Sequence, residues 1–243
     1  MLKDVFGELE FEIQYREKME NFYRDIIGNE NELNEFFKRV FKHDETDRTP
    51  RRIMNHIQQL VSLADDIDII RPRRDPLRIF FLRTCNEAVY KLYNEGAATT
   101  NEKVKNNFFK EYLPEEGQNY ILEHFKFTYV DYPAQADFQS GKYIDNKAGY
   151  SMTIADFALL FYKTRGMVTH EGDYWSIQYF SRDTDDAFWC SHVETDEKIL
   201  TCIEREKNKK YTYHFHTNMN YEMFRKYFVQ GCLRMLDEYI SLL

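Results

Sequence analysis

Apolar residues recur at helical spacing through the first seventy residues of the chain. This pattern predicts three amphipathic helices. The third begins with Thr49 as its cap and Pro50 at its first helical position, which is a typical helix start. The expected helices cover about residues 8–27, 30–42 and 49–65.

The run IRPRRDP, which begins at Ile70, interrupts this helical pattern with two prolines and three arginines. Proline cannot continue a helix interior, so we expect the chain to change direction there. The sequence therefore predicts a boundary between an N-terminal helical segment, 1–72, and a second part, 73–243.

A second helical block begins at Asp75, with Pro76 in its first turn, and its apolar stripe ends at Gly96. Two shorter helices are expected next, interrupted near Pro114. From there the content of Pro, Gly, Asp and Asn over 126–150 predicts an irregular loop. Such a loop is either a binding or lid segment or a surface crossover with its own packing.

In the last third of the chain, the spacing of the apolar residues changes twice, from helical to alternating and back to helical. Thr153 and Asp156 form a capping-box start, and apolar residues then follow at helical spacing up to Gly172. Over about 173–217, aromatic and β-branched residues alternate with period two, and a long helix starts near Asn220. The pattern predicts a mainly α fold with a small antiparallel β insertion of three or four strands before the C-terminal helix.

Composition agrees with long regular elements, because 20 Phe and 18 Tyr stand against 9 Gly and 5 Pro. The net charge of −8 excludes a general electrostatic attraction to nucleic acid, so any such contact has to be local. We interpret the two densest basic runs, 47–52 and 71–78, as solvated linker charges. With no leader peptide and no long apolar window, we expect a cytoplasmic protein without a membrane segment.

The positions of the cysteines and histidines are only weak evidence for a metal-binding site. The four cysteines have no short paired spacing, and we expect ordinary reduced core residues; they are Cys85, Cys190, Cys202 and Cys232. Cys190 and His192 share one face of a predicted strand, and His214 and His216 share one face of another. We favour a solvated strand face over a zinc site, and expect neither a metal nor a cofactor.

Arg165 occupies an unusual place on the helix that begins at Thr153. At 100° per residue it lies almost below Ile154, on the apolar stripe itself, where a guanidinium needs a partner. His170, five residues later, is about 140° away on a regular helix. Spacing alone leaves open an interface salt bridge plus a surface histidine.

The stretch ALLFYKTRGMVTHEG, 158–172, resembles the signature of the HEPN superfamily, and of its Apea-like or abortive-infection-type ribonucleases. In these helical domains an Arg, four to six residues and a His end an inner helix, often after a tyrosine and before a glycine. Tyr162, Arg165, His170 and Gly172 stand at the matching places. The likeness covers this helix, and more loosely the element order after 75.

The resemblance implies a metal-independent endoribonuclease that acts as a homodimer, with Arg165 and His170 as catalytic residues. The stripe carrying Arg165 would then face the second subunit, and Tyr162, Lys163 and Thr169 would contact RNA. A histidine that titrates near neutral pH can move the proton of a ribose 2'-hydroxyl, and a forked guanidinium can stabilise the charge that develops on phosphorus. The resemblance also implies a toxin or antiviral-defence effector with a possible antitoxin or regulatory partner protein.

Two departures from the family pattern keep alternatives open. Gly166 stands where the family usually has a polar residue, and the β insertion is not part of the minimal helical bundle. One alternative is a non-catalytic module that uses Arg165 to bind a nucleotide or a protein, with Gly166 marking lost catalysis. Another is a metal-stabilised interaction domain built on the β insertion.

Overall fold

The computed structural model describes residues 2–94, 108–131, 143–145, 151–166, 179, 189–195 and 211–243, and the side chains of 14–94, 108–128, 151–164, 179 and 214–243. The elements are α1 (Leu2–Ile27), α2 (Glu30–Phe41), α3 (Thr49–Ile70), α4 (Asp75–Tyr93), the π-helix η1 (Phe108–Tyr112), α6 (Glu115–His124), β1 (Phe125–Asp131), β2 (Tyr143–Asp145), α7 (Ile154–Gly166), β3 (Trp189–Thr195), β4 (Tyr211–Thr217) and α8 (Tyr221–Ser241).

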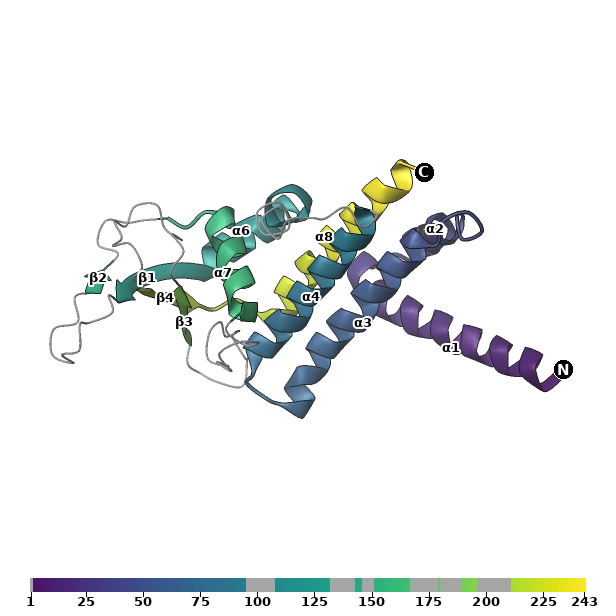
Figure 1. The fold of residues 1–243 in the computed structure, drawn as a ribbon, viewed down its shortest axis with the longest axis horizontal. Coiled ribbons are helices and arrows are strands. Elements are labelled where there is room, and N and C mark those ends of the chain that lie inside the picture. The colour runs from purple at the N-terminus through teal and green to yellow at the C-terminus, as the bar shows by residue number, and fades with distance from the viewer. Residues whose placement is uncertain are drawn as a thin grey trace.

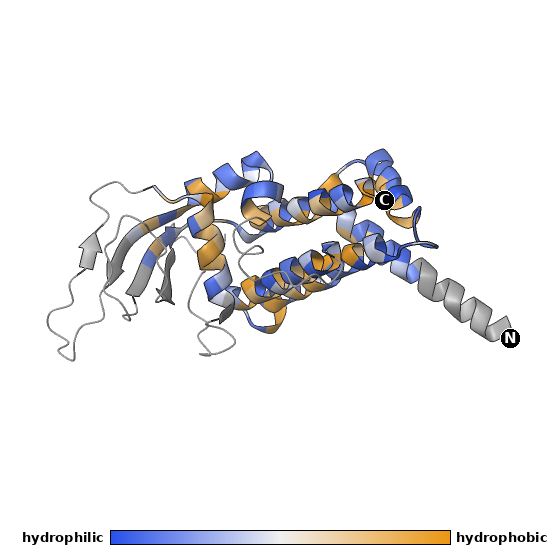
Figure 2. Ribbon diagram, turned by 45° about the horizontal axis from the view of Figure 1, so that its top comes forward, coloured by the Kyte–Doolittle hydropathy of each residue, from blue (hydrophilic) through white to orange (hydrophobic). Residues whose placement is uncertain are grey.

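The fold is mainly helical, with a small antiparallel sheet at one end (Figure 1). Helices α3, α4 and α8 run side by side, α1 and α2 lie toward the end opposite the sheet, and α6 and α7 connect the bundle to the sheet. The three N-terminal helices and the C-terminal helix are confirmed, although α3 continues to Ile70 rather than ending near 65. In Figure 2 hydrophobic residues recur along the helices of the bundle, and those that are buried form its core.

The parts before and after the expected boundary at 72 contribute to one continuous core. Tyr23 on α1 is fully buried, and its hydroxyl donates to the Met54 carbonyl of α3 at 2.7 Å. Between α3 and α8, Asp65 accepts from the Tyr221 hydroxyl at 2.8 Å and from Arg225 Nε at 2.8 Å. The domain boundary itself stays a prediction.

The sheet has the order β2-β1-β4-β3, and every neighbouring pair is antiparallel. Strands β3 and β4 fall in the expected insertion; other strands expected there lie outside the described residues. The prediction of an irregular loop over 126–150 was wrong for β1 and β2. The alternation is short but real, since Phe125 and Phe127 are buried while Lys126 between them is exposed.

One face of the sheet packs on α7 through aromatic side chains. Phe125 on β1 stacks on Phe215 of β4 with ring centroids 5.0 Å apart, and meets Phe157 of α7 edge-on at 5.4 Å. Because neighbouring residues of a strand point to opposite faces, His214 and His216 flank Phe215 on the outer face. The sheet therefore has one buried face, packed against α7, the helix that carries the HEPN-like motif, and one outer face.

The cysteine prediction is confirmed for the two cysteines whose side chains are described. Cys85 on α4 and Cys232 on α8 are buried and reduced. Burial raises the pKa of the Cys232 thiol, and its hydrogen bond with Cys85 adds to the effect. The Cys232 thiol therefore stays protonated in the core. Among the described helices, none is long and apolar enough to cross a membrane.

The interruption near Pro114 is confirmed, with η1 before it and α6 after it. Gly117 on α6 lies against α8: a Cβ added there would be 2.9 Å from both Cβ and Cγ of Tyr227. These are the atoms of Tyr227 nearest its backbone, so they cannot swing away. A side chain at this position would force the two helices apart.

We expect Gly117→Ala to lower the free energy of unfolding by about 1–3 kcal/mol, as overpacking typically does. In a helix without tertiary contacts, replacing glycine by alanine would instead stabilise the helix by about 1 kcal/mol. Urea unfolding followed by circular dichroism measures the difference. Asn119→Ala, at an exposed position of the same helix, is the control. A Gly117→Ala variant at least as stable as the wild type would contradict the close approach.

Candidate functional site

The start of the motif helix α7 is fixed by the predicted capping box. The backbone N–H of Thr153 donates to Asp156 Oδ2 at 2.8 Å, and the Thr153 hydroxyl donates to the same oxygen at 2.7 Å. In return the N–H of Asp156 donates to Thr153 Oγ1 at 3.2 Å. These reciprocal bonds fix the start of the helix and satisfy backbone N–H groups of its first turn.

The apolar stripe of α7 packs inside the protein's own core. Phe157 and Phe161 are each 1% exposed. Both rings lie within 5.3 Å of the Phe109 ring of η1, and Phe161 also lies 5.9 Å from Phe224 and 6.3 Å from Phe228 on α8. The expectation that this stripe faces a second subunit is therefore wrong for its described part, because the chain's own phenylalanines already cover it.

A buried arginine lies beside the last two turns of α7. Arg83 on α4 is 2% exposed, and its guanidinium carbon lies 4.5 Å from the centroid of the Tyr162 ring. Arg83 Nη1 donates to Asn86 Oδ1 at 3.2 Å, and Nη2 lies 3.1 Å from Glu87 Oε1. The contacts with Asn86 and Glu87 lie within α4 and offset the cost of burying the Arg83 charge. The contact with Tyr162 is the one that joins α4 to α7.

The pattern of α4 could have revealed this cluster. Arg83 follows Ile79 by four residues, and Asn86 follows Leu82 by four, so both polar residues fall on the apolar stripe of the helix. This is the signal that singled out Arg165 on α7. Asn86 and Arg83 are 3% and 2% exposed, and the side-chain amide nitrogen Nδ2 of Asn86 has no hydrogen-bond partner among the described residues.

The structure places part of the predicted site. Tyr162 is partly buried against Arg83, and Lys163 is partly buried on the same helix. Arg165 lies in the last turn of α7, three residues after Tyr162; its side chain is outside those described. Thr169 and His170 lie outside the described residues. The structure thus brings Tyr162 into contact with Arg83 and leaves the Arg165–His170 pairing a proposal.

A second polar network lies at the N-terminal end of α4. The Asp75 carboxylate is buried; its Oδ2 accepts from the backbone N–H of Tyr179 at 2.8 Å, and Oδ1 accepts from Arg78 at 3.2 Å. The Arg78 guanidinium also lies 4.2 Å from the centroid of the Tyr221 ring. This network ties the chain that follows α7 back to the start of α4.

Burial raises the pKa of Asp75, and the Tyr179 N–H and Arg78 only partly offset it. The folded pKa therefore lies above the unfolded value of about 3.9. The contribution of Asp75 to the free energy of unfolding is therefore fully present below the unfolded pKa. This contribution is lost as pH rises through the folded pKa.

We compare the free energies of unfolding of the wild type and of Asp75→Asn. The difference in favour of the wild type should become smaller as pH rises from about 4 to about 7. Urea unfolding of both proteins at each pH measures it. Asp68→Asn is the matched control, because Asp68 pairs with the same Arg78 from an exposed position. An advantage that grows with pH would show that the pKa of Asp75 is lowered instead.

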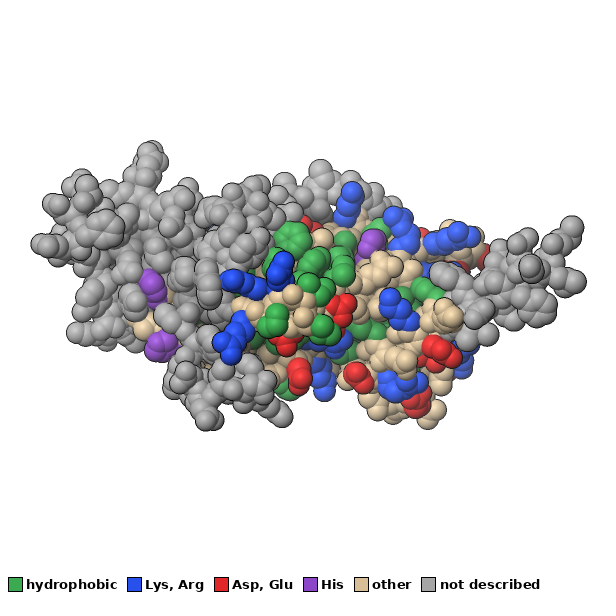
Figure 3. Space-filling view, turned by 90° about the horizontal axis from the view of Figure 1, so that it is seen from below, with side chains coloured by type: hydrophobic (Ala, Val, Ile, Leu, Met, Phe, Trp, Pro, Cys, Tyr) green, Lys and Arg blue, Asp and Glu red, His purple; other side chains and the backbone are tan. Residues whose placement is uncertain are grey.

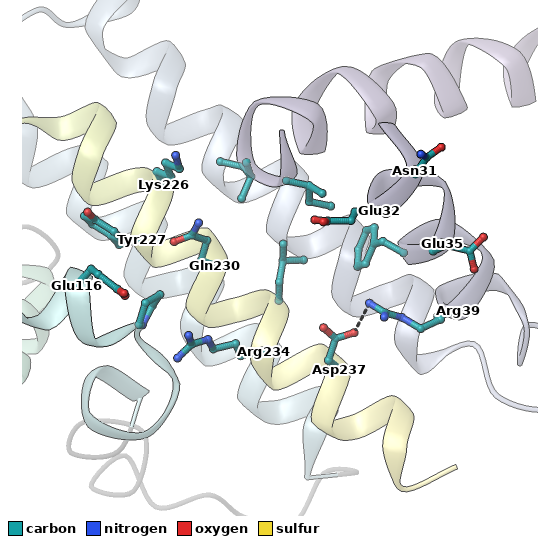
Figure 4. Close-up of a pocket in the computed structure, with 15 residues that line it drawn as sticks. Asn31, Glu32, Glu35, Arg39, Glu116, Lys226, Tyr227, Gln230, Arg234 and Asp237 are labelled. Atoms are coloured by element: carbon teal, nitrogen blue, oxygen red, sulfur yellow. Dashed lines mark hydrogen bonds and ion pairs between the residues drawn. The ribbon is translucent and has the colours of Figure 1, made fainter. Parts of the chain in front are cut away.

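A groove lies away from α7. It has a volume of about 830 Å³ and runs between the end of α1, α2, the start of α6 and α8 (Figure 4). Arg39 of α2 and Asp237 of α8 form an ion pair across it at 2.9 Å. Its charged lining mixes both signs, with Glu32, Glu35, Glu116 and Asp237 against Arg39, Lys226 and Arg234. Such a groove provides no net positive potential for a phosphate.

The chain matches no family model, and neither a curated protein nor a solved structure matches it. The likeness to the HEPN superfamily therefore rests on the residues of the motif helix. Chemically, the described part of the site offers the Arg83–Glu87 ion pair and the Tyr162 ring, three residues before Arg165 on a helix held by an aromatic core.

Proposed function

We propose that this protein is a metal-independent endoribonuclease of HEPN type, with Arg165 and His170 as catalytic residues, acting as a toxin or antiviral-defence effector. The observation that supports the proposal best is the buried Arg83, which contacts Tyr162 one helical turn before Arg165 and pairs with the partly exposed Glu87. Functional residues need neighbours that hold them in position. Arg83 is thus a positioning residue, since it fixes Tyr162 and the end of α7.

The proposed reaction needs one base and one cation. His170 accepts the proton of a ribose 2'-hydroxyl as the 2'-oxygen forms a bond to phosphorus, and the bond from phosphorus to the 5'-oxygen breaks. The proton is then delivered to the departing 5'-oxygen. The Arg165 guanidinium stabilises the negative charge that develops on the phosphoryl oxygens. The products are a 2',3'-cyclic phosphate and a 5'-hydroxyl, and DNA is resistant because it has no 2'-hydroxyl.

Chain connectivity is compatible with this pair. Four residues lead from Gly166 to His170, a chain length of at most about 14 Å. Further on, the backbone of Tyr179 is bound to Asp75 at the N-terminal end of α4. The segment that carries His170 therefore starts and ends at described points of the same end of the helical bundle.

In this proposal the second copy binds at the connection between α3 and α4. Ile69 and Ile70 are 82% and 65% exposed there. The connection lies at the same end of the bundle as the C-terminal end of α7 in Figures 1 and 2, so a two-fold contact would bring two copies of Arg165 together. Figure 3 shows Lys and Arg side chains beside hydrophobic ones on this side of the molecule. The arginines of 71–74 would then flank the RNA strand.

The deciding assay incubates the purified full chain in EDTA with an RNA and a single-stranded DNA of matched sequence. We expect cleavage of the RNA alone, and loss of cleavage in Arg165→Ala and His170→Ala. No RNA cleavage, or equal cleavage by wild type and variants, contradicts the nuclease. RNA binding that depends on Arg165 without any cleavage would favour the non-catalytic module.

We expect the double variant Ile69→Asp/Ile70→Asp to be a monomer, because two charges would have to be desolvated at the contact. RNA cleavage at equal protein concentration should fall with the dimer. Analytical ultracentrifugation gives the oligomeric state. Leu242→Asp/Leu243→Asp, at two exposed leucines of the C-terminal end, is the matched control. A wild type that is monomeric at micromolar concentration would remove this interface.

A further inference from the structure

Two neighbouring strands carry cysteine and histidine at facing positions. The register of β3 and β4 pairs Cys190 with His216 and His192 with His214. Residues directly opposite in an antiparallel pair share a face, and residues two apart on one strand share a face. All four positions therefore belong to one face of the sheet, as the corners of a rectangle.

This face is the outer one. Phe215, between the two histidines of β4, is 0% exposed and stacks on Phe125 in the core. His216 is exposed and His214 is partly exposed, so neither is a core histidine. Histidine side chains are visible at the sheet end of the molecule in Figure 3. His214 and His216 are therefore within reach of an ion from solvent.

The spacing suits one metal ion. Cβ atoms of directly opposite residues are about 5 Å apart, and residues two apart on a strand are about 7 Å apart. Imidazole and thiolate are the ligands that zinc prefers in a four-coordinate site, with Zn–N of about 2.0–2.1 Å and Zn–S of about 2.3 Å. Carboxylates are missing from the set, which makes Ca²⁺ and Mg²⁺ poor candidates.

We propose that Cys190, His192, His214 and His216 form a structural zinc site that links β3 to β4. Strand β3 lies at the end of the sheet order with β4 as its neighbour, so the link would fasten an edge strand. On the other side of β4, Lys126 of β1 pairs with His216. A single thiolate from Cys190 lowers the charge of the bound ion beside that lysine.

The side chains described include His214 and His216 but not Cys190 and His192, and within that set no three metal-binding side chains form a group. The proposal therefore rests on the strand register. It is independent of the ribonuclease proposal, since α7 contributes no residue to the four and its test measures metal binding.

The test loads the purified full chain with zinc, removes excess metal, and measures bound zinc by elemental analysis and native mass spectrometry. We expect one zinc per chain. Competition with a chelator should show at least about tenfold weaker binding in Cys190→Ala, His192→Ala, His214→Ala and His216→Ala, since even outer-shell changes weaken metal sites by that much. His43→Ala, a partly buried histidine between α2 and α3, and Ser191→Ala, between two proposed ligands, are the controls.

Cobalt(II) substitution gives a second readout, whose first part needs only the wild type. The wild type should show the strong visible bands of a tetrahedral site together with a thiolate-to-cobalt band, and Cys190→Ala should lose the latter. Retention of less than one zinc per chain by the wild type would overturn the proposal. So would ligand variants that bind zinc as tightly as His43→Ala and Ser191→Ala.

Discussion

Replacing Arg165 by alanine is expected to lower kcat for RNA cleavage by about 10²- to 10³-fold, with a much smaller change in RNA affinity. The proposed role of Arg165 is to stabilise charge that develops only as the 2'-oxygen attacks, and removal of one such donor typically costs this much. Single-turnover cleavage of a labelled RNA, with binding measured separately on a 2'-deoxy analogue, separates the two effects.

Two further variants refine this expectation for Arg165. Arg165→Lys keeps the charge but loses the fork that can contact two phosphoryl oxygens, so its kcat should lie between those of wild type and Arg165→Ala. Lys163→Ala, on the same helix, is the matched control for loss of a positive charge and should mainly affect KM. If Arg165→Ala raised KM and left kcat unchanged, Arg165 would be a binding residue rather than a catalytic one.

Arg83→Met is expected to lower the free energy of unfolding by about 3 kcal/mol. This is the lower end of the range for a broken buried ion pair, because the Glu87 side chain is 24% exposed and water can reach it. Methionine retains much of the packing against Tyr162, so the loss reports mainly on the charge. Urea unfolding measures the change, and Lys91→Met, at an exposed position of the same helix, controls for the loss of a cation.

The double variant Arg83→Met/Glu87→Leu should recover part of this stability, because no carboxylate is then left without its partner. If Arg83 positions the end of α7, the double variant should still cleave RNA poorly despite its recovered stability. Full recovery of both stability and cleavage would assign Arg83 a structural role alone.

Periodicity predicted the helices well where local signals and packing agree. Thr153 and Asp156 predicted a capping box, and the structure contains it. Asn220 caps α8, because its side chain accepts from the N–H of Met223 at 3.2 Å. Strand β1 was missed because its alternation is short and the polar residues after it suggested a loop. Its pairing with β4 comes from a segment far along the chain, which no local pattern reports.

The candidate site was predictable only in part, for a similar reason. Helical spacing identifies Arg165 and Arg83 separately as cations on apolar stripes. That Arg83 meets Tyr162 depends on how α4 and α7 cross, which is decided by the packing of the phenylalanine core. Likewise, spacing placed two cysteine or histidine residues on each of two predicted strands. Only the register of β3 with β4 shows that these four positions are neighbours on one face of the sheet.

The pairing of β1 with β4 also has a consequence for synthesis on the ribosome. Phe125 pairs with Thr217, and α7 lies between them in the chain, so the sheet under α7 is incomplete until β4 has emerged. Contacts so distant in sequence form late and slowly. Helix α8, which supplies Phe224 and Phe228 to the core around α7, emerges later still. A nascent chain would therefore carry the motif helix without the support that positions it, and a nuclease assembled in this order would remain inactive while its own message is still being translated.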